Sequence, residues 1–178
     1  MDNNAIAFTG LCAEYCALAA GCAGHTPGRF TEAMLRLLPR IYICAADLKA
    51  DTTIDDNIWI DAALTEEQYN EVREQISVVM GENDTYLEVF EEDMKYSDTP
   101  LAASVSENLA DIYQVLYDYL NTVRLGTDQV TAQAIATVKE SFRDYWSATL
   151  CNVLRALNRI WQSEPTTGND DADSEGLD

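Results

Sequence analysis

Apolar residues recur at spacings of three and four along most of the chain, which is the period of one face of an α-helix. The first such segment covers residues 4–23, and the turn "AGHTPGR" separates it from a second helix over 29–49. Pro39 lies inside the second segment. Because a proline there removes one backbone hydrogen bond, we expect this helix to kink or to end early.

Residues 50–64 have no regular period and are predicted to form a loop. Thr65 and Gln68 form the capping-box pattern, so a helix begins there, and Gly81 is placed to end it. A further short helix is predicted around 84–94, from the spacing of its aromatic and aliphatic residues.

Two longer helices complete the pattern. Ser104 or Ser106 caps a helix that runs to about Gly126, and the last helix covers about 128–162. Alternation of the strand type is nearly absent. The sequence therefore predicts an all-α fold, an up-and-down bundle of about six helices with a long C-terminal helix.

The domain organisation follows from where the periodicity stops. Residues 1–162 are expected to form one helical bundle domain, and the polar residues 163–178 a disordered acidic tail. The chain has 178 residues, of which 47% are hydrophobic, and this is enough for one domain with a real core.

Charge narrows the range of partners. The formal net charge is −20, and residues 51–119 alone hold eighteen acidic and two basic residues. Phosphate groups repel such a chain, so we expect neither direct nucleic acid binding nor binding to an anionic membrane. A basic protein is the partner that this charge favours.

The cysteines indicate the compartment. Five are present, an odd number whose spacing matches no disulfide framework, as is typical of reduced thiols in the cytoplasm. The first residues, "MDNNAIAF", lack the basic region of a signal peptide, and no apolar run reaches the ~20 residues of a membrane span. We therefore expect a cytoplasmic protein.

Carboxylates recur on the polar sides of three predicted helices. In "ENLADIYQVLYDYL" (107–120), Leu109, Ile112 and Leu116 form the apolar stripe, so the acids of this helix are predicted to face water. A solvated surface that keeps the protein soluble is one interpretation, and a docking surface is the other. The residues predicted for docking are Glu67, Glu71, Glu74, Glu88, Asp111 and Asp118.

Two cations lie on the predicted apolar face of the last helix. Lys139 and Arg143 fall on the line of Trp146 and Leu150. Such cations either reach solvent by their long stems, pair with acids, or line a pocket for an anion. The predicted ligand-binding residues are Lys139, Arg143, Tyr113 and Trp146.

No constellation points to chemistry or to a metal. The spacing of Glu107 and Asp111 permits a magnesium site, but their predicted outward orientation opposes it. Cys12 and Cys16 lack the second pair that zinc needs, and His25 lies in a turn. We predict no catalytic residue, no metal and no cofactor.

Four stretches occur in an order that resembles a known family: "LLPRIYICAADL" (37–48), "YLEVFEED" (86–93), "ENLADIYQVLYDYL" (107–120) and "SFRDYWSATLCNVLRAL" (141–157). Together they resemble the bacterial family catalogued as domain of unknown function 5063, over most of residues 5–160. The resemblance implies an all-helical cytoplasmic bacterial protein and no established activity.

Two classes of function remain. The first is a non-catalytic, acidic helical interaction protein that docks a basic protein surface. The alternative is a small-molecule or anion binder, or a hydrolase, that uses a pocket near Lys139 and Arg143.

Overall fold

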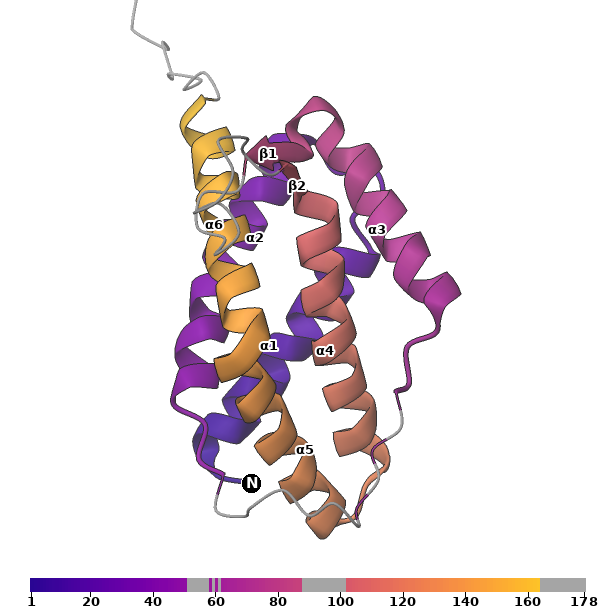
Figure 1. Cartoon of the computed structure of the whole chain (residues 1–178), viewed down its shortest axis with the longest axis vertical. Helices are drawn as coiled ribbons and strands as arrows, with labels where there is room; N and C mark the ends of the chain where they lie inside the picture. The colour runs from indigo at the N-terminus through magenta and orange to yellow at the C-terminus, as the bar shows by residue number, and fades with distance from the viewer. Residues whose placement is uncertain (51–57, 59, 61, 88–101, 164–178) are drawn as a thin grey trace, which may run out of the picture.

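The computed structural model describes residues 1–50, 58, 60, 62–87 and 102–163, which are mostly helical. From α1 to α5, successive helices alternate in direction along the long axis of the molecule, and α6 continues the direction of α5 (Figure 1). The helices are α1 (Asn3–Ala20), α2 (Pro27–Ala46), α3 (Glu66–Met80), α4 (Val105–Leu125), α5 (Asp128–Ser141) and α6 (Ser147–Ser163).

The predicted last helix exists, but it contains a π-helical turn. This turn, η3 (Phe142–Trp146), joins α5 to α6 without a break. When these three elements are counted as one rod, the described residues form five helical rods, so the prediction of about six helices is not confirmed. The predicted tail lies outside the described residues from 164 onward.

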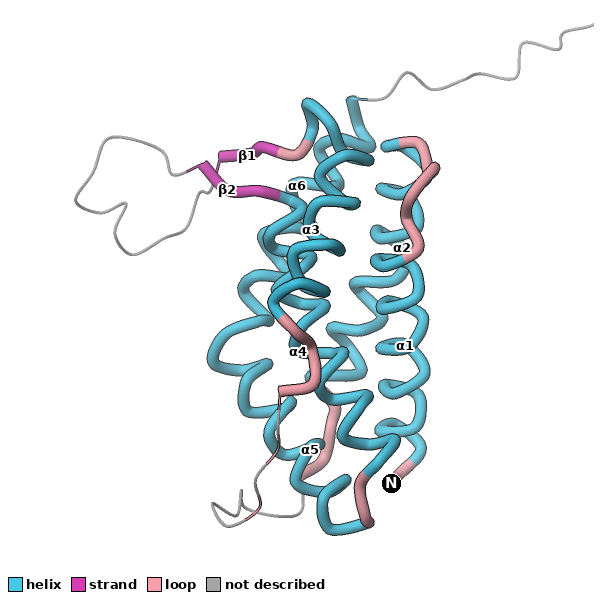
Figure 2. The backbone as a smooth tube through the Cα atoms, turned by 90° about the vertical axis from the view of Figure 1, so that its right-hand side faces the viewer, coloured by secondary structure: helices cyan, strands magenta, loops and turns pink. Residues whose placement is uncertain are grey.

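The predicted short helix over 84–94 is wrong where it can be compared. After the 3₁₀ turn η1 (Gly81–Asn83), β1 (Thr85–Leu87) pairs antiparallel with β2 (Ala102–Ser104). Figure 2 shows this pair projecting from the side of the bundle. Threonine and tyrosine favour strands, but the hydrogen-bonding partner is distant in sequence, so the local pattern could not reveal it. Residues 88–94, and with them Glu88, lie outside the described residues.

The helix ends follow the predicted chemistry more closely. The amide of Gln68 donates to Thr65 Oγ1 at 3.2 Å, and the Thr65 amide donates to Gln68 Oε1 at 3.0 Å, which confirms the capping box. Gly81 ends α3 with φ +54°, a conformation that favours glycine. In contrast, α2 continues through Pro39 to Ala46, so the predicted early end is wrong.

Helix α4 is the centre of the core, because it packs against α1, α3, α5 and α6. The buried Tyr15 of α1 donates from its hydroxyl to the carbonyl oxygen of Leu109 at 2.7 Å. Trp146 is also fully buried, and its Nε1 donates to the carbonyl of Val138 and to Ser141 Oγ. The polar groups that these two large rings carry into the core therefore have partners.

One carboxylate ties the end of α3 to the start of α4. Asp84 Oδ2 accepts hydrogen bonds from the hydroxyls of Ser77, Ser104 and Ser106, at 3.1, 3.0 and 2.8 Å. Its Oδ1 accepts from the amide of Ser106 at 2.7 Å. The negative charge also lies at the N-terminus of α4, where the helix dipole stabilises it.

We therefore predict that Asp84→Ala lowers the free energy of unfolding by about 2 kcal/mol, because four donors lose their acceptor. The melting temperature falls by about 4–8 °C. Urea denaturation followed by circular dichroism measures the change. Glu82→Ala, an exposed acid two residues earlier, is the control and changes stability by less than about 0.5 kcal/mol. Equal effects of the two substitutions would contradict the role given to Asp84.

Candidate functional site

Helix α3 presents a row of carboxylates to water. Glu67, Glu71 and Glu74 are all exposed, as predicted. They stand at positions i, i+4 and i+7 of one helix, so they form a ridge about 10 Å long. We call these three residues the α3 ridge.

The α3 ridge has no cationic partner among the described residues. The ion pairs among the described residues join Arg36 to Glu32 and Arg40 to Glu14, and none of these residues belongs to α3. The side chain of Gln75 donates a long, exposed hydrogen bond of 3.4 Å to Glu71. The negative charge of the ridge is therefore left to solvent.

Asp118 is partly buried against another segment, so its predicted position on an open solvent face is wrong. Its Oδ1 accepts hydrogen bonds from the amides of Ala63 and Leu64, at 2.7 and 2.9 Å. These amides belong to the segment just before α3, which therefore lies against the side of α4 that the helical wheel assigned to solvent. The carboxylate holds this segment in place.

Asp111 is also partly buried, between three elements. It accepts hydrogen bonds from the hydroxyl of Tyr69 in α3 at 2.7 Å and from that of Tyr145 in η3 at 3.1 Å. Burial raises the pKa of Tyr69 and of Tyr145, and the hydrogen bond to Asp111 and its charge raise both further. Phenols with raised pKa values stay protonated at neutral pH, so they act as donors here and not as bases.

Lys139 and Arg143 do line a pocket, which we call the α2–η3 pocket. Its volume is about 700 Å³. Tyr42 and Phe142 belong to its wall, with their rings edge to face at 5.0 Å, and Asp144 also lines it. The charged residues that line this pocket, with Glu140 included, sum to zero.

The other two residues predicted for this pocket do not line it. Trp146 is in the core. Tyr113 stacks on Tyr117, with the ring centroids 5.6 Å apart, and lines a different pocket beside Cys16. Burial raises the pKa of Tyr113 to about 12.

The π-helical turn explains why the core-facing line was misplaced. Counting back from Leu150 at about 100° per residue puts Arg143 on the apolar face. A π turn holds one extra residue, so the buried face rotates by about 100° between α6 and α5. Phe142 and Val138 consequently face the core, Arg143 is exposed and Lys139 is half-buried.

The thiols are structural in character. Cys12, Cys16 and Cys22 are buried and unpaired, as predicted. Burial raises the pKa of Cys16 to about 12 and that of Cys12 well above its ordinary value, so neither forms a thiolate at neutral pH. Nowhere in the described ranges do three residues of the His, Cys, Asp or Glu types gather so as to hold a metal ion. The helices in those ranges are all too short or too polar to cross a membrane.

A pocket that the sequence did not indicate lies between α2 and α6, with a volume of about 690 Å³. We call it the α2–α6 groove. Leu35, Leu154 and Trp161 supply much of its wall. The indole of Trp161 is 53% exposed although the apolar period places it on the core-facing side. That mismatch appears only once the neighbouring helix is placed.

The fold and these surfaces define a helical bundle protein. The chain belongs to the family described as Domain of unknown function (DUF5063), which matches residues 1–163. This confirms the resemblance noted from the sequence. No curated protein matches the chain.

A solved structure extends the comparison. The crystal structure of protein BF1032 from Bacteroides fragilis is similar, with a TM-score of 0.79 and 28% sequence identity. The alignment covers 92% of this chain and 98% of the other chain. The two proteins therefore share the same fold. The name of the BF1032 structure states no activity.

The Asp111 cluster makes a testable prediction at alkaline pH. The raised pKa values of Tyr69 and Tyr145 mean that the folded protein prefers their protonated forms. Their contribution to stability is full below the ordinary tyrosine pKa of about 10 and is lost as the pH rises above it. Asp111→Asn removes the carboxylate charge, so these two tyrosines ionise at lower pH than in the unaltered protein.

Tyrosinate absorbance during a pH titration measures this shift. Asp118→Asn is the matched control, because Asp118 accepts from backbone amides and not from phenols. It leaves the titration unchanged. Superimposable curves for Asp111→Asn and the unaltered protein would show that Asp111 does not set these pKa values.

Proposed function

We propose that this protein is a non-catalytic interaction protein and that the α3 ridge docks on a basic surface of another protein. The observation that supports the proposal is the exposure of Glu67, Glu71 and Glu74 without a cationic partner among the described residues. Glu66, at the start of the same helix, is also exposed and adds to the charge.

The electrostatics suit docking more than stability. Three like charges along about 10 Å repel one another, so they do not stabilise α3. Their fields overlap within a Debye length of about 8 Å at physiological ionic strength, so a basic surface experiences them together. Such a field speeds the encounter with a basic partner and fixes its orientation.

The buried polar groups support a non-catalytic role. Asp111 and Asp118, the acids that sequence analysis placed on the docking surface, are engaged by phenols and by backbone amides. These hydrogen bonds give both carboxylates a structural role, because each one ties α4 to a neighbouring segment. The proposal places the protein in the cytoplasm, where its five free cysteines stay reduced.

The proposal predicts that the triple variant Glu67→Gln, Glu71→Gln, Glu74→Gln binds its partner about tenfold more weakly at low salt, since each exposed charge pair contributes up to ~1 kcal/mol. Affinity capture from cell lysate with mass spectrometry identifies the partner. Titration calorimetry with the purified partner then measures binding at low and high salt. The difference between the variant and the unaltered protein shrinks as salt increases.

The matched control is Asp47→Asn, Asp128→Asn, Glu140→Gln, which changes the net charge by the same amount at scattered exposed positions. Its affinity stays within about twofold of the unaltered protein. If both triple variants lost the same affinity for the partner, the loss would come from net charge alone, and the α3 ridge would not be the docking site. A partner without a basic surface would also contradict the proposal.

The α2–η3 pocket favours a second candidate function, the binding of a small anion by Lys139 and Arg143. The supporting observation is the pocket itself, which has the volume of small-molecule sites. Both side chains reach it from successive turns, one from α5 and one from η3.

For this second candidate we expect inorganic pyrophosphate to bind the unaltered protein with one-to-one stoichiometry in low-salt titration calorimetry. Binding is lost in Lys139→Gln, Arg143→Gln. Lys49→Gln, Arg124→Gln makes the same change in net charge at exposed positions outside the pocket, and retains binding. Absence of binding to the unaltered protein, or equal loss in both double variants, rules out this site.

A further inference from the structure

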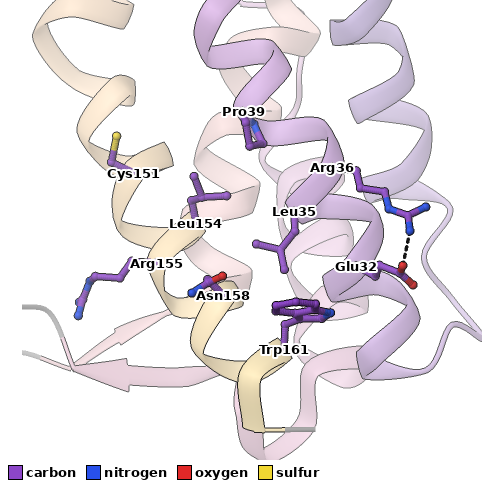
Figure 3. A pocket seen from close by; sticks show the side chains of 9 residues that line it. All are labelled: Glu32, Leu35, Arg36, Pro39, Cys151, Leu154, Arg155, Asn158 and Trp161. Atoms are coloured by element: carbon purple, nitrogen blue, oxygen red, sulfur yellow. Dashed lines mark hydrogen bonds and ion pairs between the residues drawn. The ribbon is translucent and has the colours of Figure 1, made fainter. Parts of the chain in front are cut away.

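The α2–α6 groove is open to solvent and apolar along its floor. Figure 3 shows Leu35 and Leu154 pointing toward one another from the two helices, with the indole of Trp161 beside Leu35. Pro39 continues the apolar surface along α2. Leu35 and Leu154 are only partly buried, so the groove leaves aliphatic surface in contact with water.

Trp161 is the clearest sign that the groove is incomplete. Its side chain is among the largest in the protein, yet it is 53% exposed. Leaving an indole and two leucines at a concave surface costs hydrophobic free energy that a bound apolar group would recover. A volume of about 690 Å³ is in the range of small-molecule pockets.

The rim of the groove carries a positive excess. Glu32 and Arg36 form an ion pair at one edge and cancel. Arg155 stands at the opposite edge, where its side chain points outward from α6 (Figure 3) and donates to the carbonyl oxygen of Leu87 at 3.2 Å. It has no acidic partner among the described residues, and a guanidinium group has further donors beside the one used in this bond. The lining thus sums to +1 in a chain whose net charge is −20.

We propose that the α2–α6 groove binds a small amphiphilic anion, an aliphatic or aromatic body that carries one acidic group. The body lies on Leu35, Leu154 and Trp161, and the acidic group lies at the Arg155 edge. An anion is favoured here because elsewhere the acidic surface repels it, and guanidinium donors pair well with carboxylate or sulfonate oxygens. The site is separate from the α3 ridge and from the α2–η3 pocket.

Two fluorescent probes test the proposal. 8-Anilinonaphthalene-1-sulfonate has an aromatic body with one sulfonate, and N-phenyl-1-naphthylamine has the same body without the charge. We expect the folded protein to bind one equivalent of the anion about fivefold more tightly than the neutral probe, and dodecanoate to displace it. Circular dichroism confirms that each variant is folded.

Three variants separate charge from packing. Arg155→Gln lowers the affinity for the anionic probe about fivefold and leaves the affinity for the neutral probe within about twofold of the unaltered protein. Arg159→Gln is the matched control, because Arg159 is an exposed residue of the same helix that does not line the groove. It changes neither probe. Trp161→Ala weakens both probes, since it removes apolar surface that the two bodies share.

Cys151 supplies a second measurement that does not depend on fluorescence. It lines the groove and is exposed, whereas Cys12, Cys16 and Cys22 are buried. Dodecanoate at saturation slows alkylation of Cys151 by iodoacetamide at least about threefold by peptide mass spectrometry, because the bound body covers the sulfur. Alkylation of Cys44, outside the groove, keeps its rate.

Several results would overturn the proposal. Equal affinities for the two probes, or equal effects of Arg155→Gln and Arg159→Gln, would contradict the recognition of an acidic group by Arg155. Binding that survives Trp161→Ala, or an unchanged rate at Cys151 under saturating dodecanoate, would place the probe elsewhere. None of these outcomes bears on the α3 ridge, which is tested with a protein partner.

Discussion

The enclosure of α4 is the constraint on which the rest of the structure depends. Four other helices pack against it, so little of its circumference is left to water. A polar group on such a helix must find a partner inside the protein, because an unpaired buried group costs about 1–3 kcal/mol. Several neighbouring segments supply such partners: Tyr15 from α1, Tyr69 from α3, Tyr145 from η3 and the amides of Ala63 and Leu64.

The same requirement gives the carboxylates on and around α4 their partners. Asp84, which lies between η1 and β1, accepts hydrogen bonds at the start of α4. On α4 itself, Asp111 accepts from two phenols and Asp118 accepts from the segment that leads into α3. Each of these acids therefore fixes one neighbour in register with α4. The helix is stabilised by apolar packing, and the carboxylates determine which arrangement of neighbours is allowed.

The features that could be predicted from the sequence are those that residues close together in the chain determine. The capping box at Thr65 and the glycine end at Gly81 are decided within four residues, and both are confirmed. The apolar stripes of α1 and α2 are also confirmed, since Phe8, Tyr15 and Ile41 are fully buried. These features need no knowledge of the tertiary fold.

The errors arose where a helix was treated as isolated or regular. Asp118 looked solvent-exposed because one helical wheel shows one stripe, whereas α4 has neighbours on several sides. Arg143 looked core-facing because the wheel assumed a constant period through the π turn. Tyr86 looked helical because its strand partner, Ala103, is seventeen residues away. None of these signals is present in a local window.

The candidate binding surfaces also differ in whether local sequence could predict them. Exposure of the α3 ridge could be predicted, because α3 packs mainly on one neighbour and keeps a true solvent face. The α2–α6 groove could not, because its walls come from residues more than a hundred positions apart. The exposure of Trp161 at this groove becomes visible only once the two helices are placed relative to one another.

The arrangement also keeps the two proposed surfaces independent. Helices α3 and α6 lie on opposite sides of α4 (Figure 1), and no residue of α3 lines the α2–α6 groove. Helix α4 contacts both helices, and its Asp111 accepts hydrogen bonds from Tyr69 of α3 and from Tyr145 of η3, the turn that leads into α6. A shift of α3 large enough to break one of these hydrogen bonds would free a carboxylate oxygen beside η3. Asp111 thus links α3 and η3 through one hydrogen bond to each.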